Sequence, residues 1–191
     1  MAEHTNTWFD DQARSLWEKH VLPVFGEGQW CKYLEIGVYE GQSMEWVLKN
    51  LSVNQAVGID PWVGRRKKWK SVMPVAKQTA FSTLAQWLDD GTLELIEGYS
   101  HDELGSLPTN NFNLVYIDGD HRAPEAMLDV CLSFRNLSLG GMMIIDDLNR
   151  DWVRGRPQVL PVVHAIPMLF HGRLELAWKE GRQIAFSKID G

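Results

Sequence analysis

Two short apolar runs in the second half of the chain each stop abruptly on acidic residues. Residues 114–117 are followed by Asp118 and Asp120, and residues 142–145 are followed by Asp146 and Asp147. Continuous β-prone runs of this length are typical of strands that are buried on both faces of a parallel sheet. Carboxylates that lie close together repel one another, so a cluster of them needs a cation, a proton or a polar ligand. We therefore interpret these acids as the candidate functional site.

The segment between the two runs explains why the acids would meet. Residues 124–137 have the length of a helix, and Gly140 with Gly141 closes the segment. A strand, a helix and a second strand form a βαβ unit, whose parallel strands end at the same edge of the sheet. Because open α/β sheets bind their ligands at the carboxyl ends of the strands, we call this the ligand edge.

A glycine-punctuated turn supplies a second ligand feature. Residues 33–41, Tyr-Leu-Glu-Ile-Gly-Val-Tyr-Glu-Gly, predict a strand and a tight turn, and apolar residues at helical spacing follow Ser43. Such a turn presents backbone N–H groups and a helix N-terminus to an anionic group. Tyr39 and Gln42 stand where the nicotinamide fingerprint G-x-G-x-x-G requires glycines, which argues against a nucleotide-binding oxidoreductase. A tight turn without any ligand is the open alternative.

Two further strands bring polar residues to the ligand edge. Residues 56–60 end on Asp60, about twenty residues beyond the glycine turn, where an acid can accept hydrogen bonds from a ribose diol. A solvated strand end or a helix N-cap would explain Asp60 equally well. Residues 93–97 predict a third strand, whose following loop lies on the same edge. Ser100 and Glu103 fit the S-x-x-E capping box that opens a helix.

The remaining periodicities predict one α/β domain over residues 1–191. The fold class is a Rossmann-like, seven-stranded, mostly parallel sheet flanked by helices, with a C-terminal antiparallel β-hairpin. The other expected elements are an amphipathic N-terminal helix over 8–25 that ends or kinks at Pro23, helices over 76–88 and 159–170, and hairpin strands over 173–178 and 183–189.

Composition limits the classes of function. Of the 191 residues 45% are hydrophobic, and the net charge of −6 argues against a general nucleic-acid-binding role. No apolar stretch approaches membrane-spanning length. Cys31 and Cys131 lack paired spacing and are expected to be buried, reduced thiols, which fits a cytoplasmic protein. A basic run at residues 65–70 is either solvated surface or a recognition site for an anionic substrate.

In combination, these motifs resemble those of a known enzyme class. The pattern E-x-G-x-x-x-G at residues 35–41, Asp60, and residues 112–118 are similar in order and spacing to class I S-adenosylmethionine-dependent methyltransferases. Within that class, Tyr-Ile-Asp-Gly-Asp-His at 116–121, followed by Gly-Gly-x-x-Ile-Ile-Asp-Asp at 140–147, resembles the metal-dependent O-methyltransferases of the macrocin and catechol types. The resemblance implies S-adenosyl-L-methionine as cofactor and O-methylation of a small hydroxylated acceptor.

The same resemblance implies a role for each matching residue. The expected cofactor-binding residues are Glu35, Gly37, Tyr39, Gly41, Ser43, Asp60, Gly98, Tyr99, Ser100 and Asp118. Asp118, Asp146 and Asp147 fall on the three metal-ligand positions, and their hard oxygen atoms suit Mg²⁺, Mn²⁺ or Ca²⁺ rather than zinc. His121 falls where the family carries its base, often a lysine, so we expect His121 and Asp118 to be catalytic. A histidine hydrogen-bonded to Asp120 or to backbone is the alternative.

Other interpretations stay open at this point. A methyltransferase of the same fold could use no metal, and its carboxylates would then be structural or would bind an amine. A cofactor-binding module could also act through a partner without catalysis. We expect a small-molecule acceptor rather than a nucleic acid or a membrane, and a lid formed by the chain itself or by a second copy in a homodimer. Four aromatic residues are expected at the ligand edge, as acceptor-pocket wall or as packing on the sheet rim: Tyr39, Trp62, Trp69 and Trp152.

Overall fold

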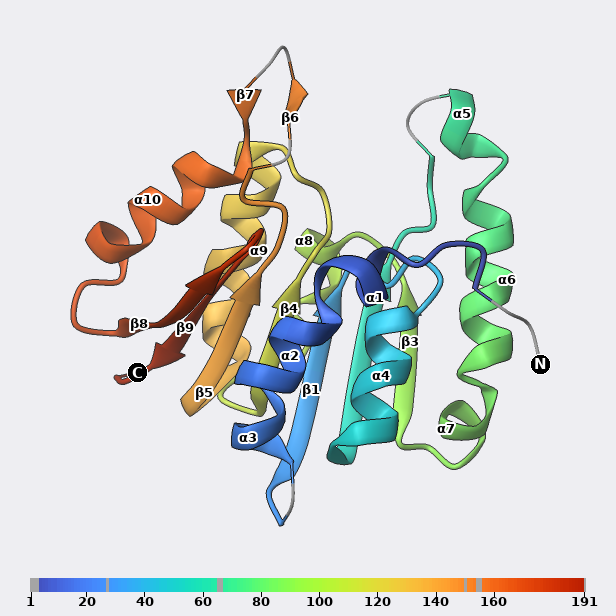
Figure 1. Ribbon diagram of the computed structural model, residues 1–191, viewed down its shortest axis with the longest axis horizontal. Coiled ribbons are helices and arrows are strands. Elements are labelled where there is room, and N and C mark those ends of the chain that lie inside the picture. Colours follow the sequence, from blue (N-terminus) through green and yellow to red (C-terminus); the bar gives the residue numbers. More distant parts are fainter. Residues whose placement is uncertain (1–3, 27, 65–66, 150, 154–155, 191) are drawn as a thin grey trace.

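The computed structural model describes residues 4–26, 28–64, 67–149, 151–153 and 156–190. In this part of the chain a seven-stranded sheet has the order β3-β2-β1-β4-β5-β9-β8 (Figure 1). Its strands are β1 (Trp30–Ile36), β2 (Ser52–Asp60), β3 (Leu93–Glu97), β4 (Phe112–Ile117), β5 (Leu137–Ile145), β8 (Leu174–Glu180) and β9 (Gln183–Lys188). Strands β1 to β5 are parallel, and β9 and β8 follow β5 as an antiparallel pair, which confirms the predicted fold class.

Strand register brings the predicted site residues to one edge. Ile36 of β1 lies opposite Ile59 of β2 and Ile117 of β4, and Ile117 lies opposite Ile145 of β5. The residues that follow these positions therefore emerge side by side at the carboxyl ends of four parallel strands. The predicted ligand edge is confirmed as a geometric feature.

Helices cover both faces of the sheet (Figure 1). Alternate strand residues face opposite layers, since Leu114 packs with α1 to α4 and α6, whereas Val115 packs with α9 and α10. Burial on both faces explains why the central strands are continuous apolar runs. The helices are α1 (Trp8–Gln12), α2 (Arg14–His20), α3 (Leu22–Phe25), α4 (Gln42–Asn50), α5 (Lys67–Lys70), α6 (Met73–Thr83), α7 (Ala85–Asp89), α8 (Ser100–Glu103), α9 (Ala123–Asn136) and α10 (Val159–Leu169).

Several predicted elements differ in detail. The single N-terminal helix is instead three short helices, broken at Ala13 and Val21, which are both buried, with Pro23 in the first turn of α3 where its missing N–H costs nothing. The helix expected over 76–88 is divided at Leu84. Gly140 and Gly141 lie inside β5 rather than before it. A small antiparallel pair, β6 (Asp151–Val153) and β7 (Arg156–Pro157), follows β5.

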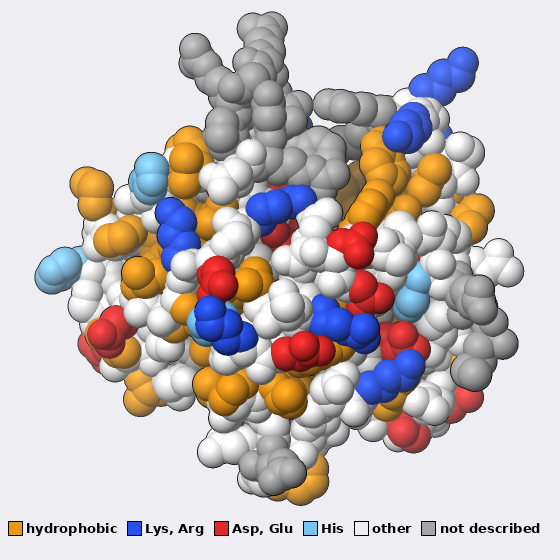
Figure 2. All heavy atoms as spheres, viewed as in Figure 1, with side chains coloured by type: hydrophobic (Ala, Val, Ile, Leu, Met, Phe, Trp, Pro, Cys, Tyr) orange, Lys and Arg blue, Asp and Glu red, His pale blue; other side chains and the backbone are white. Residues whose placement is uncertain are grey.

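Surface features were predicted less well than the sheet. Cys31 is buried as expected, but Cys131 is exposed because it lies on the outer side of α9, whose inner side buries Val130 and Phe134. Arg65 and Arg66 of the basic run lie outside the described residues. On the described part of the face in Figure 2, Lys and Arg side chains are interspersed with Asp and Glu side chains. None of the helices described is long and apolar enough to cross a membrane.

Candidate functional site

A cavity of about 660 Å³ opens at the carboxyl ends of the parallel strands. Its wall is built from the N-terminal segment, the turn after β1, the loops after β2, β3 and β4, the start of α9, and the residues after β5. Of the residues predicted to bind cofactor or metal or to act in catalysis, ten lie in this wall: Gly37, Tyr39, Ser43, Asp60, Tyr99, Ser100, Asp118, His121, Asp146 and Asp147.

The turn after β1 requires glycine for a steric reason. Gly37 has a φ of 91°, and a Cβ there would stand 2.2 Å from the backbone oxygen of Asp118. This close approach joins the end of β1 to the end of β4. Gly41, with a φ of 83°, precedes α4, so the turn delivers the chain into the helix start that borders the cavity.

Glu35 lies beneath the turn and is completely buried, so it is not part of the cavity wall. Its carboxylate accepts hydrogen bonds from the Ser43 hydroxyl and, at 3.0 Å, from the Tyr33 hydroxyl. Burial raises the pKa of Glu35 to about 8, although both hydroxyl donors oppose that shift. Ser43 lies in the cavity wall and Glu35 lies behind it, so the expected contact of Glu35 with the cofactor stays a prediction.

Asp60 links the turn to the loop after β2. Its two carboxylate oxygens accept hydrogen bonds from the backbone N–H groups of Tyr39 at 2.8 Å and Trp62 at 2.6 Å. Burial raises the pKa of Asp60, and these backbone donors act in the opposite direction. Each carboxylate oxygen has a second lone pair, so Asp60 in the cavity wall can still accept a hydrogen bond from a ligand.

The loop after β3 forms the opposite end of the cavity from the residues after β5. Tyr99 and Ser100 lie in the wall, and Ser100 donates a hydrogen bond to Asp129 of α9 at 2.5 Å. Ser100 is the first residue of α8 and makes no capping hydrogen bond, so the predicted capping box was wrong. Its hydroxyl is used by Asp129 instead. Gly98 lies outside the wall, and a Cβ there would stand 2.6 Å from a Glu103 carboxylate oxygen.

The acids after β4 and β5 do not form one uniform cluster. The Tyr116 hydroxyl lies 3.2 Å from a carboxylate oxygen of Asp118 and 2.5 Å from one of Asp146. Asp146 also accepts from the Gln183 amide at 2.8 Å and from the backbone N–H of Asp147 at 2.5 Å. Asp146 is therefore held toward the sheet by its neighbours.

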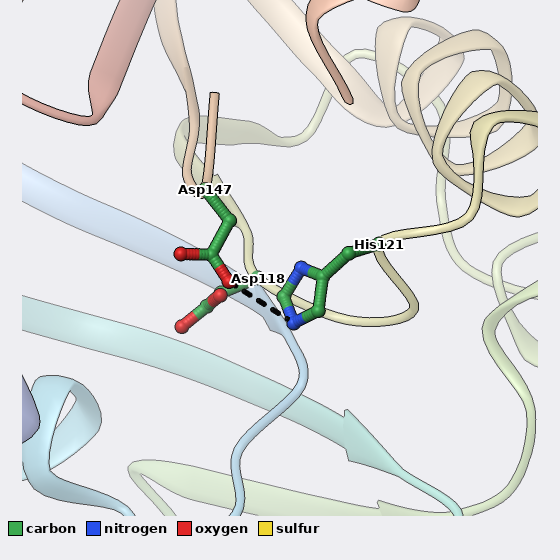
Figure 3. Close-up of side chains that lie close together, drawn as sticks. All are labelled: Asp118, His121 and Asp147. Carbon is green, nitrogen blue, oxygen red and sulfur yellow. Dashed lines mark ion pairs between the residues drawn. The ribbon is translucent and has the colours of Figure 1, made fainter. Parts of the chain in front are cut away.

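Asp118, His121 and Asp147 do come together (Figure 3). One possible metal-ligand atom from each lies within 4.8 Å of the others. The Nε2 atom of His121 is 3.2 Å from a carboxylate oxygen of Asp147, whose side chain is 2% exposed. Asp120, the partner considered from the sequence, pairs with Arg122 at 2.9 Å. The residues brought together thus include His121 in place of the expected Asp146.

Arg182 is a site residue that sequence patterns missed. Its guanidinium is ion-paired with Asp147 and hydrogen-bonded to the Gln12 side chain. It sits in the turn between β8 and β9, and its backbone oxygen accepts from the N–H of Leu148 at 3.0 Å. Because β9 runs antiparallel beside β5, it begins where β5 ends. Topology, rather than a motif, was the signal that could have found Arg182.

Glu40, which sequence patterns also left unassigned, holds the N-terminal segment before α1 by hydrogen bonds. Glu40 is buried and accepts from the Thr5 backbone at 2.7 Å and from the Asn6 side chain at 3.1 Å. The backbone of Phe9 donates to Gln42 at 3.2 Å. Residues of this segment thereby become cavity wall.

Aromatic side chains line the same side. Trp8 stacks on Tyr39 with ring centroids 5.3 Å apart, and the Trp69 ring lies 6.3 Å from Trp8 and 6.2 Å from Tyr39. All three belong to the cavity wall, as expected for Tyr39 and Trp69. Trp62 is buried outside it and donates its indole N–H to the Tyr39 backbone at 2.8 Å. The Trp152 side chain lies outside the described residues.

Comparison with known proteins identifies the family to which this chain belongs. A sequence model of the family described as "Methyltransferase domain" matches residues 34–148. An uncharacterized protein of Acanthamoeba polyphaga mimivirus is 30% identical over 141 residues, which cover 70% of this chain and 58% of that protein. The chain therefore spans less than two thirds of this relative's length.

Solved structures share the fold. An O-methyltransferase from Bacillus cereus, solved with S-adenosylhomocysteine, is 19% identical with a TM-score of 0.58, over 82% of this chain and 74% of that one. Spermidine synthase from Thermotoga maritima is 18% identical with a TM-score of 0.61, over 95% of this chain and 62% of that one. At these identities the likeness shows the fold alone. The family match, however, spans more than half of the chain and contains the glycine turn, Asp60 and the acids after β4 and β5, so the protein belongs to the family of methyltransferase domains.

Proposed function

We propose that the protein is an S-adenosylmethionine-dependent O-methyltransferase that acts on a small hydroxylated acceptor. The observation that carries this proposal is the pair of His121 and Asp147, 3.2 Å apart, in the same cavity as the glycine turn and Asp60. One end of the cavity thus offers groups suited to a nucleoside, and the other offers a base. A volume of about 660 Å³ suits a cofactor with a small acceptor rather than a polymer.

Strand order suggests how the cofactor would lie. A ribose bound at Asp60 would sit at the end of β2, and the loop after β3, with Tyr99 and Ser100, is next to it for the adenine. On the other side of β2, the turn after β1 and Ser43 would receive the methionine end. The methyl group would then face the end of β4, where Asp118 and His121 lie.

The reaction needs positioning and one proton transfer. The acceptor oxygen forms a bond to the methyl carbon as the carbon–sulfur bond of the sulfonium breaks, and S-adenosylhomocysteine leaves. The acceptor proton passes to His121, whose ring is held by Asp147. The Tyr116 hydroxyl holds Asp118 at the edge of the reacting site, at 3.2 Å. Holding both reactants in line is the larger contribution in such a displacement.

A divalent cation fits part of this site. Asp118, Asp147 and His121 each offer a ligand atom within the 4.8 Å span, and two of them supply hard oxygen atoms. When bound, a cation of this kind would lower the pKa of the acceptor hydroxyl. The ion pair of Arg182 with Asp147 favours the metal-independent alternative, because the chain's own guanidinium already balances that carboxylate. His121 acts as base in that alternative.

Methyl transfer is the direct test. Radiolabelled S-adenosylmethionine should label hydroxylated compounds in an acceptor screen, and His121→Asn should lower turnover sharply while leaving S-adenosylhomocysteine affinity unchanged. His171→Asn, on an exposed residue, is the matched control. Transfer to amines alone, or full turnover by His121→Asn, would contradict the proposal.

The metal component has its own readout. If a bound cation takes part in the reaction, EDTA treatment should suppress turnover, and Mg²⁺ or Mn²⁺ should restore it and raise the melting temperature. Full activity after EDTA, together with a melting temperature that ignores Mg²⁺, Mn²⁺ and Ca²⁺, would assign the enzyme to the metal-independent alternative.

A further inference from the structure

One buried carboxyl group in the cavity wall has no part in the proposed chemistry. Asp129 lies on α9, is 3% exposed and belongs to the wall. Its Oδ1 atom accepts the Ser100 hydroxyl at 2.5 Å, and its Oδ2 atom lies 3.4 Å from where a Cβ at Gly119 would stand. Burial raises the pKa of Asp129 to about 6. Among the described residues Ser100 is the one hydrogen-bond donor to this carboxyl, which can accept several.

The surroundings of Asp129 suit a flat heterocycle. Tyr99 and His101, from the loop after β3, stack with ring centroids 5.4 Å apart and 21° between their planes. Leu128, the residue before Asp129, also lies in the cavity wall and is 42% exposed. Aromatic and apolar side chains around a buried acceptor are the features expected where a purine ring binds. This end of the cavity lies beside β2, whose last residue is Asp60.

We propose that Asp129, held in place by Ser100, accepts a hydrogen bond from the exocyclic amine of the cofactor's adenine and makes the cavity selective for adenine nucleosides. The inference rests on the proposed function, which places an adenosyl group in this cavity. A carboxylate oxygen attracts an amine at this position and repels a carbonyl oxygen. A hypoxanthine ring carries a carbonyl in place of that amine and an N1–H in place of the N1 lone pair, so at the C6 position it presents an acceptor that Asp129 repels.

Two ligands and two variants distinguish recognition of adenine by Asp129 from a purely structural role of Asp129. Calorimetry on the full chain would measure the affinities of S-adenosylhomocysteine and S-inosylhomocysteine, whose bases carry the amine and the carbonyl respectively. The wild-type protein should prefer the adenosyl ligand by about tenfold or more, as one charge-assisted hydrogen bond allows. Asp129→Asn adds an amide donor that can bond the carbonyl, so the preference should shrink by about tenfold or invert. Asp102→Asn, on an acid that is 65% exposed in the same loop region, should leave the preference unchanged.

Ser100→Ala tests whether the adenine preference comes from the Ser100–Asp129 hydrogen bond rather than from direct contact of Asp129 with the adenine. This variant removes the Oδ1 donor, so it should weaken both ligands to a similar extent while keeping the adenine preference. Equal losses for both ligands in Asp129→Asn, with the preference intact, would overturn the inference and leave Asp129 as a support for the loop. Failure of the wild-type protein to bind S-adenosylhomocysteine at all would instead overturn the proposed function, so the two failures are distinguishable.

Discussion

Gly37→Ala should destabilise the protein for two reasons, one conformational and one steric, both in the turn after β1. A residue other than glycine at a φ of 91° costs roughly 1–2 kcal/mol. The new Cβ would also stand 2.2 Å and 2.6 Å from the backbone oxygen and carbon of Asp118, which cannot rotate away. Relief of such overlap typically costs a further ~1–3 kcal/mol, so the total is about 2–5 kcal/mol of unfolding free energy.

Gly91→Ala is the matched control. Gly91 has a φ of 78°, but nothing lies within 4 Å of a Cβ at that position, so only the conformational cost applies. Urea denaturation should show a loss of roughly 1–2 kcal/mol for Gly91→Ala and a clearly larger loss for Gly37→Ala. Calorimetry should show weaker S-adenosylhomocysteine binding for Gly37→Ala alone. Equal stability losses in the two variants, with unchanged ligand affinity, would refute the steric account of this turn.

Three other substitutions test separate parts of the site. The folded-state pKa of Glu35, about 8, exceeds its ordinary value of 4.5, so the free energy of unfolding should fall as pH rises from about 5 to 8. Denaturation curves recorded across this pH range should show a flatter dependence for Glu35→Gln. Tyr116→Phe removes the hydroxyl that bonds Asp146 at 2.5 Å and should cost roughly 1–3 kcal/mol by urea denaturation. Glu40→Gln weakens the hold on Thr5, so limited proteolysis should cut the N-terminal segment faster than in the wild-type protein.

Sequence patterns predicted the sheet and its ligand edge because both depend on local chemistry. Residues 114–117 and 142–145 are apolar throughout because they are buried on both faces, and a parallel crossover must bring their following acids together. Gly37 was singled out as part of a tight turn, and its φ of 91° is a backbone conformation that other residues rarely adopt.

The details of the site depend on tertiary contacts that no local pattern encodes. Asp146 and Asp147 are adjacent in sequence, yet one is held by Tyr116 and Gln183 while the other meets His121. Glutamate and arginine side chains look like ordinary surface charges in the sequence. Glu40 becomes buried only because the N-terminal segment packs over it, and Arg182 reaches the site only because β9 pairs with β5.

Isothermal calorimetry with the wild-type protein shows directly whether the cavity at the strand ends binds the S-adenosyl cofactor. S-adenosylhomocysteine and NAD would be titrated in parallel. Both ligands contain adenosine, but only S-adenosylhomocysteine carries the amino-acid end that the glycine turn and Ser43 would receive. We expect one S-adenosylhomocysteine to bind per chain and NAD not to bind. Binding of NAD without any binding of S-adenosylhomocysteine would contradict this expectation.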